Sequence, residues 1–504
     1  MHPAMLLSPL RFLPLEPAQL SLAAVLKCGQ TFLWRKGRAR ATLPEDGVKL
    51  EHGKHDLYEW SYGHRDRTIV LRQDSQGIHY RSLFPTNHAA AHAEDLKNDT
   101  TLQFLRKYFV LDTSLPDLYS FWSARDSNFS KKTSGGTRFG GIRILRQPAW
   151  ECLIEFICSS NNNIGRIEGM LRRLLKLYGE RLPCPAELDS PAGASTTTEE
   201  DYIYAFPAPS TLLGDKVTAS LRTAGFGYRD AYVTRTAALV CEMAEEAGYS
   251  LDPEEWLETV SKLSEQEARE VLLTFSGVGP KVADCILLFG LGFEDVVPVD
   301  THVYQIAVRD YGLKGSRDAT VSKAMYGKIR EKLQEAWGQK AGWAHQILFT
   351  ADLRSFSDFE DPLLALETVS AAQLLVKKEA EDLSRLVKKE EQELPSPLST
   401  QVKVEEVEAT AITMHTPTKR KRGAVSTSTS TARSRKIVVK SEIKTVKREL
   451  SSAAAAQFYP TPPETPSSSK SVDFDYFGES PISLVERVKR NRTSSRTSPR
   501  IKRV

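Results

Sequence analysis

The sequence predicts an α+β fold, in which an antiparallel-sheet domain is followed by a mostly helical domain and then by a basic tail. Three observations predict it. β-leaning runs at residues 68–71 and 78–81 stand among turn residues early in the chain. Apolar residues at helical spacing dominate residues 146–355. Beyond residue 360 the chain has no Trp and has long Ser, Thr, Pro and Lys stretches, a composition typical of disorder.

The first domain is expected over residues 1–145. Its short β-leaning runs are separated by turn residues such as those at 45–47, which is typical of antiparallel strands joined by tight turns. We therefore expect an antiparallel sheet with some helix.

The helical domain is expected over residues 146–357. Two sets of apolar residues each share one helix face, and breakers separate the helices. The first face carries Trp150, Leu153, Ile154 and Ile157, the second carries Val282, Cys285, Ile286 and Phe289, and the breakers are at residues 161–163, 225–227, 277–279 and 298. A polar stretch at 189–200 is expected to be a surface insertion.

The tail is expected over residues 358–504, disordered except for a short helix within 363–387. Its last part, residues 411–504, holds 20 Lys and Arg against 7 Asp and Glu, although the whole chain has a net charge of only +4. Such a segment favours polyanionic partners. Three basic runs resemble nuclear-import or DNA-tethering signals, with solvated charge runs as the alternative: residues 419–422, 433–440 and 489–492.

A short motif recurs five times in this tail: an aliphatic residue, Lys, any residue and Glu. It resembles the acceptor motif for small ubiquitin-like modifiers (SUMO), although a tail rich in Val, Lys and Glu also produces it by composition. The motif occurs at residues 376–379, 387–390, 402–405, 439–442 and 446–449.

Composition argues against several classes of protein. The 504-residue chain has six Cys and no CxxC pair, so zinc ribbons and thioredoxin-type chemistry lose support, and we expect free thiols, no metal and no cofactor. Its longest apolar runs are far shorter than the roughly 20 residues of a membrane-spanning helix, and no secretory signal pattern opens the chain. We therefore expect neither a membrane protein nor a secreted one.

The most informative segment is residues 272–285, which is typical of two helices joined by a tight turn at Gly277, Val278 and Gly279. Pro280 is a favoured first residue for the second helix. Glycines let backbone N–H groups turn towards an anion. This helix–hairpin–helix pattern therefore indicates binding of a nucleic-acid phosphate without base reading.

Lys281 follows in the first turn of the second helix. There the positive helix end and partial burial are expected to depress its pKa and leave a free amine able to attack carbon; a phosphate contact is the alternative. Asp300 lies 19 residues further on. A carboxylate beside a lysine suits cleavage of a glycosidic bond, because it stabilises an oxocarbenium-like sugar. Asp300 can at the same time cap a helix that begins at Thr301.

Six segments resemble those of the eukaryotic 8-oxoguanine DNA glycosylase/lyase family, within the helix–hairpin–helix glycosylase superfamily. They follow the family's order within residues 5–355 and lie at 28–34, 159–166, 225–229, 277–285, 298–302 and 341–349. The resemblance implies a TBP-like sheet domain before the helical domain. It also implies removal of 8-oxoguanine, and of formamidopyrimidine-guanine, opposite cytosine, followed by strand cleavage through a lysine Schiff base.

The resemblance assigns roles in a lesion pocket. Lys281 would displace the base and form the Schiff base, with Asp300 as its electrostatic partner. Cys285 and Phe349 would lie on either side of the flipped purine. The carbonyl of Gly29 would accept the ring hydrogen that distinguishes oxidised from normal guanine. The alternatives are core positions for Cys285 and Phe349 and a plain turn at Gly29.

A second set of residues would hold the DNA around the lesion. Asn161, Arg166 and Arg229 would read the unpaired cytosine, because Arg and Asn carry forked donors and acceptors. Tyr228 would fill the gap left by the extruded nucleotide, and His302 would contact a phosphate. The alternatives are a polar helix end at Asn161 and plain surface positions for Arg229 and His302.

Two positions depart from the family. His345 stands where the family's glutamine reads the pairing edge of guanine, with Gln346 next to it, and Leu33 replaces an arginine. An imidazole has a different reach and a pH-dependent charge, so His345 can shift specificity among oxidised purines. The lack of four clustered cysteines after the helical domain argues against iron–sulphur relatives, and Lys281 argues against monofunctional alkyl-base relatives.

The expected partner is damaged double-stranded DNA, bound by a monomer, with an import receptor and SUMO-type modification acting on the tail. The nucleus is the expected location, with a mitochondrial fraction left open. A non-catalytic DNA or chromatin binder is the competing interpretation. Such a binder needs neither Lys281 with Asp300 nor a pocket built from Gly29, Cys285 and Phe349.

Overall fold

The computed structural model describes residues 5–38, 58–185, 202–315, 322–359, 361 and 363–364. The chain divides into two units by its contacts: Met1–Leu386 with Glu479–Val504, and Val387–Gly478. All described residues belong to the first unit. The expected turn at 45–47, insertion at 189–200, helix within 363–387 beyond its first two residues, and the basic and SUMO-type motifs lie outside the described residues.

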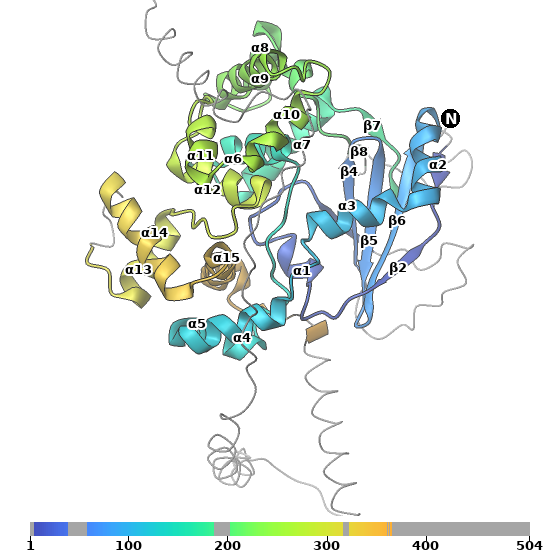
Figure 1. Cartoon of the computed structure of the whole chain (residues 1–504). Coiled ribbons are helices and arrows are strands. Elements are labelled where there is room, and N and C mark those ends of the chain that lie inside the picture. Colours follow the sequence, from blue (N-terminus) through green and yellow to red (C-terminus); the bar gives the residue numbers. More distant parts are fainter. Residues whose placement is uncertain are drawn as a thin grey trace, which may run out of the picture. The chain divides into compact units, whose positions relative to one another are not determined.

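An antiparallel sheet of six strands forms the first part of the chain (Figure 1). The strand order is β1-β6-β5-β4-β3, and β2 also pairs with β6. The strands are β1 (Met5–Leu7), β2 (Arg11–Pro14), β3 (Arg35–Arg38), β4 (Tyr58–His64), β5 (Arg67–Gln73) and β6 (Gly77–Pro85). The strands predicted at 68–71 and 78–81 are confirmed as β5 and β6, and their register pairs Leu71 with Tyr80.

Aromatic side chains form the core beside this sheet. Trp34 stacks on Tyr62 of β4 with ring centroids 4.9 Å apart, and its indole N–H donates to the hydroxyl of Tyr108 at 2.9 Å. Tyr108 belongs to α3 (Thr100–Tyr108), which follows η1 (Thr86–His88) and α2 (Ala89–Asn98). Because each buried indole and hydroxyl has a partner, these large rings are buried without an unmet polar group.

A second pair of strands, β7 (Arg181–Leu182) and β8 (Ile203–Tyr204), lies against the sheet. β8 approaches β4 so closely at Gly63 that a Cβ there would overlap the carbonyl oxygen of Tyr204. Glycine therefore allows this close approach.

The predicted helical domain is confirmed. None of the described helices is both long and apolar enough to span a membrane. The longer helices of the domain are α6 (Ala149–Ser159), α7 (Ile164–Tyr178), α8 (Asp215–Thr223), α9 (Arg229–Glu246), α10 (Pro253–Thr259), α11 (Glu265–Leu272), α12 (Pro280–Ile286), α13 (Thr301–Tyr311), α14 (Lys323–Trp337) and α15 (Ala341–Asp352). Earlier in the chain are α1 (Leu22–Val25), α4 (Leu115–Arg125) and α5 (Ser127–Thr133). The remaining short turns are η2 (Ser134–Gly136), η4 (Pro209–Leu212), η5 (Val260–Lys262), the π-helix η6 (Leu287–Leu291) and η7 (Arg354–Phe356).

Packing crosses the domain boundary that we expect after residue 145. Helices α4 and α5 precede that point, yet they pack against α14 and α15 (Figure 1). The indole of Trp122 donates to the carbonyl of Gln339 at 3.0 Å, and the amide of Asn128 donates to the carbonyl of Asp310 at 2.7 Å. Trp122 and the helices α4 and α5 therefore belong to the larger helical core. The predicted domain boundary after residue 145 stays a prediction.

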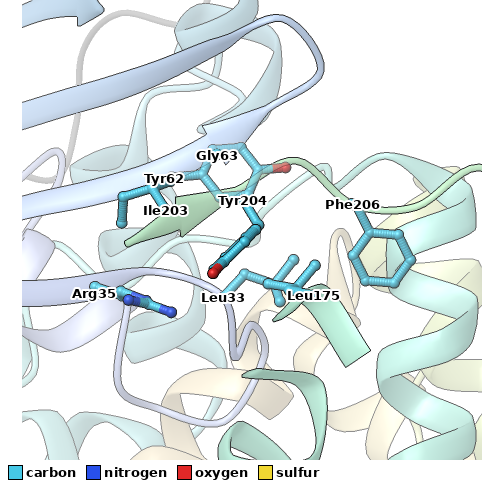
Figure 2. Close-up of a pocket in the computed structure, with 8 residues that line it drawn as sticks. All are labelled: Leu33, Arg35, Tyr62, Gly63, Leu175, Ile203, Tyr204 and Phe206. Carbon is cyan, nitrogen blue, oxygen red and sulfur yellow. The ribbon is translucent and has the colours of Figure 1, made fainter. Parts of the chain in front are cut away.

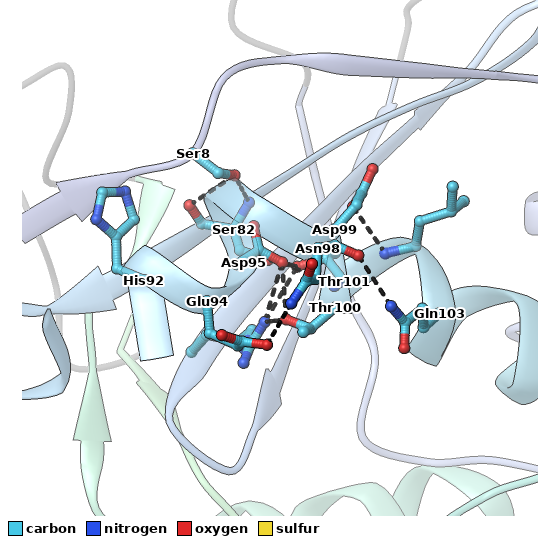
Figure 3. A network of polar contacts seen from close by, with 12 residues as sticks. Ser8, Ser82, His92, Glu94, Asp95, Asn98, Asp99, Thr100, Thr101 and Gln103 are labelled. Carbon is cyan, nitrogen blue, oxygen red and sulfur yellow. Dashed lines mark hydrogen bonds and ion pairs between the residues drawn. The ribbon is translucent and has the colours of Figure 1, made fainter. Parts of the chain in front are cut away.

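A buried carboxylate ties the sheet to α2 and α3. Asp95 has no exposed surface and accepts hydrogen bonds from the backbone and hydroxyl of Thr101, both at 2.7 Å, and from Thr100 at 3.0 Å (Figure 3). Arg11 of β2 and Arg67 of β5 pair with the same carboxylate at 2.9 and 3.2 Å. One carboxylate thus links two strands and two helices.

Replacing Asp95 by Ala is expected to lower the free energy of unfolding by about 3 kcal/mol, because it removes the buried partner that Arg11 and Arg67 share. Glu94→Ala, at an exposed position of the same helix, is the matched control and should change the free energy by no more than about 0.5 kcal/mol. Urea denaturation measures both.

The same carboxylate should show in the acid unfolding of the protein. Burial alone would raise the pKa of Asp95, but hydrogen bonds from Thr101, Arg11 and Thr100 outweigh burial and lower it. A lowered folded-state pKa contributes stability above the unfolded-state pKa of about 3.9, and this contribution is lost as the pH falls. A difference in unfolding free energy between the wild type and Asp95→Asn that stays constant as the pH falls would contradict this account.

Candidate active site

The predicted helix–hairpin–helix is confirmed, and it fixes the position of Lys281. A capping box begins α11, and Pro280 is the first residue of α12. Gly277 has φ +83°, and a Cβ there would lie 2.6 Å from the ring of Tyr232, so a side chain is excluded at this turn. Gly279 is the N-cap of α12, with open space where a Cβ would stand. Lys281 therefore projects from the first turn of α12.

Lys281 is partly buried, between aromatic and polar groups. Its Nζ lies 5.6 Å from the ring centroid of Phe156 on α6. Burial disfavours the ammonium, but the interactions of Lys281 with Cys285 and Asp300 outweigh burial and raise its pKa. The expectation of a depressed pKa is therefore wrong, because it considered the helix end and burial without these partners.

Cys285 lies one turn after Lys281 and is 2 % exposed. Burial raises the pKa of its thiol, and the ammonium of Lys281 only partly opposes this. The thiol is therefore neutral at neutral pH, and the negative charge that favours the ammonium comes from Asp300. Cys285 packs within the helical core, so the core position considered from the sequence is confirmed.

Asp300 is the N-cap of α13, so the helix cap predicted from the sequence is confirmed. Its Oδ1 accepts a hydrogen bond from the backbone N–H of Val303 at 2.9 Å. The same carboxylate acts electrostatically on Lys281 and on His345. The cap therefore brings a negative charge to the end of α13 that faces these two residues.

Gly29 lies beside Phe349 in a backbone conformation that favours glycine. Its φ is +84°, and a Cβ there would lie 3.3 Å from Ile164 and 3.9 Å from the ring of Phe349. Ile164 begins α7, which immediately follows the Asn161 turn. Gly29 thus lies between Phe349 on α15 and Ile164 at the start of α7.

Two buried glutamines hold the backbone on either side of Gly29. The amide of Gln346 donates to the carbonyl of Cys28 at 3.1 Å, and the amide of Gln147 donates to the carbonyl of Gln30 at 2.6 Å. Neither glutamine is predicted from the sequence as a site residue, and Gln346 stands out there only as the neighbour of His345. A buried glutamine in an apolar stretch is the signal that points to such residues, because its amide requires partners.

His345 and His302 both contact the ring of Phe349. The imidazole of His345 stacks on it with centroids 6.0 Å apart, and His302 meets it edge-on at 5.8 Å. His302 is exposed, whereas His345 is 5 % exposed. The Nδ1 of His345 has no well-aligned hydrogen-bond partner among the described residues.

Burial lowers the pKa of His345 to about 4. The positive charge of Lys281 lowers it as well, while Asp300 and the carbonyl of Gly342 oppose the change. His345 is therefore a neutral imidazole at neutral pH, with one nitrogen available to a ligand as donor or acceptor.

The residues expected to read the opposite base form a second cluster. Arg229 is 2 % exposed, so the surface position considered for it is wrong. Its guanidinium donates to the carbonyls of Ser160 and, at 3.2 Å, of Asn161. The hydroxyl of Tyr228 donates to the Ser160 carbonyl at 3.3 Å, and its exposed ring lies 4.4 Å from the Arg229 guanidinium carbon.

Asn161, on the turn between α6 and α7, and Arg166, in the first turn of α7, are both exposed. Asn161 has φ +48°, a left-handed conformation that Asn tolerates better than most residues. Asn163 caps α7 by accepting from the N–H of Arg166 at 3.0 Å, so the polar helix end expected here is confirmed. The cap leaves the Arg166 side chain on the outer surface of the first turn.

The structure thus groups the candidate residues into two clusters. The lesion cluster contains Gly29, Lys281, Cys285, Asp300, His302, His345 and Phe349, and the second cluster contains Asn161, Arg166, Tyr228 and Arg229. Gly277 belongs with the second, because it packs on Tyr232, whose ring lies 5.5 Å from that of Tyr228. Among the described residues, no group of His, Cys, Asp and Glu has the arrangement of a metal site.

Leu33 lies apart from both clusters. Figure 2 shows it in a small pocket between the sheet and the start of the helical part, together with Arg35, Tyr62, Gly63, Leu175, Ile203, Tyr204 and Phe206. None of the residues that line this pocket belongs to either cluster.

Comparisons with known proteins identify relatives of this chain. A family model described as "8-oxoguanine DNA glycosylase, N-terminal domain" matches residues 12–153. The N-glycosylase/DNA lyase of Saccharomyces cerevisiae is 32% identical over 358 residues, which cover 68% of this chain and 85% of the yeast protein. N-glycosylase/DNA lyase OGG1 of Arabidopsis thaliana is 31% identical over 361 residues, covering 70% and 84%.

Among solved structures, the Clostridium acetobutylicum 8-oxoguanine glycosylase/lyase in its apo-form is 24% identical, covers 68% of this chain and 99% of its own, and gives a TM-score of 0.47. The two eukaryotic relatives each match two thirds or more of both chains. The chain therefore belongs to the N-glycosylase/DNA lyase family of 8-oxoguanine DNA glycosylases.

Proposed function

We propose that this chain removes 8-oxoguanine, and formamidopyrimidine-guanine as a second substrate, from double-stranded DNA in which the lesion faces cytosine. As a family member it is a bifunctional enzyme that releases a base and then cleaves the strand. The observation that carries the proposal is the interaction of Lys281, on the second helix of the helix–hairpin–helix, with Cys285 and with Asp300 at the start of α13. An amine beside a carboxylate suits attack on a sugar carbon, whereas DNA binding alone does not need the pair.

In the proposed reaction Lys281 attacks C1′ of the lesion nucleotide as a free amine. The N-glycosidic bond breaks, its electron pair leaves with the base, and the base takes up one proton. Asp300 stabilises the positive charge that develops on the sugar. The amine and C1′ form a Schiff base as the sugar ring opens. Loss of the C2′ proton then breaks the C3′–O bond, and water hydrolyses the Schiff base to release Lys281.

We assign the lesion pocket to Gly29, Cys285, His345 and Phe349. Support comes from the ring of Phe349, which contacts His345 on one side and lies near Gly29 on another. The carbonyls next to Gly29 are held by buried amides, so its own carbonyl has little freedom. A fixed acceptor of this kind suits discrimination by a single ring hydrogen.

We assign the opposite base to Asn161, Arg166 and Arg229, the gap in the duplex to Tyr228, and a phosphate to His302. The backbone N–H groups at Gly277 and Gly279 would hold a further phosphate without reading sequence. Support comes from exposure: Tyr228 is 52 % exposed beside the buried Arg229. An exposed aromatic ring that rests on a fixed cation is suited to insertion into a base stack.

Borohydride trapping on a duplex with one 8-oxoguanine opposite cytosine tests the proposal. The wild type should give a covalent complex and free base, because the reagent reduces the Schiff base. Lys281→Gln should lose both by about three orders of magnitude or more while still binding the duplex. Lys340→Gln removes a partly buried lysine that pairs with Glu294 instead, and it should trap like the wild type.

A second duplex, with adenine opposite the lesion, tests the roles of the second cluster. The trapped complex should form more slowly on it, because Arg and Asn donors matched to cytosine would be left unpaired. Free base without a trapped complex would make water the nucleophile and remove Lys281 from its role. Equal trapping opposite cytosine and adenine would remove Asn161, Arg166 and Arg229 from theirs.

His345→Gln should change the ratio of the rates on 8-oxoguanine and formamidopyrimidine-guanine by about tenfold, because a buried polar group that no longer matches its ligand loses a hydrogen bond. Since burial lowers the pKa of His345 to about 4, the wild-type ratio should stay constant between about pH 6 and 8. His92→Gln, on α2 beside the sheet, is the control. Single-turnover rates identical to those of the wild type on both substrates would make His345 silent.

For the tail we propose nuclear import through its basic runs, and SUMO-type modification at its Val-Lys-x-Glu motifs, in a monomeric enzyme. The charge of residues 411–504 supports this. Removal of the chain after residue 360 should abolish nuclear accumulation of a fluorescent fusion and leave base release intact. Substitution of the four basic residues at 419–422 is the narrower variant, and undiminished nuclear signal in both would contradict the import role.

A further inference from the structure

A buried polar connection joins the helix that carries Lys281 to the backbone that carries Asp300. Asp284 lies three residues after Lys281 on α12 and has no exposed surface. It accepts a hydrogen bond from the hydroxyl of Tyr326 on α14 at 2.6 Å. The same hydroxyl accepts a hydrogen bond from the N–H of Val299, the residue before Asp300, at 3.2 Å.

The carboxylate of Asp284 is itself held in place. Arg269 of α11 forms an ion pair with it, and the Nε of Arg330 on α14 lies 3.8 Å away. Both arginines also pair with Glu265, at 2.5 and 2.7 Å. Arginines on two different helices therefore hold the Asp284 carboxylate in position. Tyr326 therefore donates to a fixed, charged acceptor, which makes a strong hydrogen bond.

This connection matters because Lys281 and Asp300 belong to different elements. Between them the chain runs through the π-helix η6 and a loop that ends at Pro298. The cap of α13 fixes the Asp300 carboxylate relative to its own helix only. Tyr326 bonds to both sides: to α12 through Asp284, and to the residue before Asp300 through the backbone of Val299.

We propose that Tyr326 is a positioning residue, which holds Asp300 in register with Lys281 by anchoring Val299 to Asp284. The proposal rests on the roles proposed above for Lys281 and Asp300. Tyr326 acts through them and contacts no reacting atom. Its loss leaves the reacting groups present but misaligned, and a misplacement of about 1 Å can slow a reaction roughly 100-fold.

Tyr326→Phe removes the hydroxyl and keeps the ring. Tyr311→Phe is the matched control, because Tyr311 lies at the far end of α13 and its hydroxyl also makes two bonds, donating to Asp126 at 2.5 Å and accepting from Trp337 at 2.9 Å. Each variant of the full-length protein is compared with the wild type for single-turnover release of 8-oxoguanine opposite cytosine, for duplex affinity and for melting temperature.

Tyr326→Phe should slow base release by about 10- to 100-fold with duplex affinity unchanged. Tyr311→Phe should release base at the wild-type rate, with a similar loss of melting temperature. Val299→Pro removes the same hydrogen bond from its donor side. It should slow base release as Tyr326→Phe does, and it carries the test if Tyr326→Phe does not fold.

The outcomes separate this proposal from the function on which it rests. An active wild type with equal rates for Tyr326→Phe and Tyr311→Phe would overturn the positioning role alone, as would a Tyr326→Phe defect confined to duplex affinity. A wild type that releases no base, or a Lys281→Gln variant that remains active, would overturn the proposed function and the positioning role with it.

Discussion

The lesion cluster depends on two buried amides that fix the backbone around Gly29. Gln147, just before α6, and Gln346, on α15, both donate hydrogen bonds to that backbone. A buried amide or carbonyl left without a partner costs about 1–3 kcal/mol, so these groups are satisfied only when all three segments are in place. The backbone around Gly29 is therefore fixed by the packing of the first segment against the helices, and its geometry is as rigid as that core.

The protonation state of Lys281 is the feature of the site that the proposed chemistry has to change. Its interactions with Cys285 and Asp300 raise the pKa of Lys281, so this residue is an ammonium in the ligand-free protein, and an ammonium has no electron pair with which to attack. Neither the neutral thiol of Cys285 nor His345, with its pKa of about 4, is a base for that proton at neutral pH. In the proposed mechanism, substrate binding therefore has to lower the pKa of Lys281, by removing water or by offering the proton a new acceptor, before the amine becomes a nucleophile.

Local chemistry could be predicted from the sequence, and contacts between distant segments could not. The start of α12 at Pro280 and the cap at Asp300 follow from rules that involve four or five adjacent residues, and both are confirmed. The burial of Arg229 depends on carbonyls 68 and 69 residues away. The direction of the Lys281 pKa shift likewise depends on Asp300, whose proximity was expected but whose effect was not weighed against burial.

His345 shows how one substitution can alter recognition without disturbing the charges around it. A protonated imidazole would place a second cation towards Lys281, but burial holds His345 neutral. Its stacking on Phe349 fixes the plane of the ring, while Nδ1 has no well-aligned partner among the described residues. The carbonyl of Gly342 interacts with the ring, so the imidazole has one nitrogen available to a bound purine edge. A glutamine presents a donor and an acceptor together, whereas this imidazole presents one of them at a time. Under the role proposed for His345, specificity at this position is set by which single hydrogen bond the lesion requires.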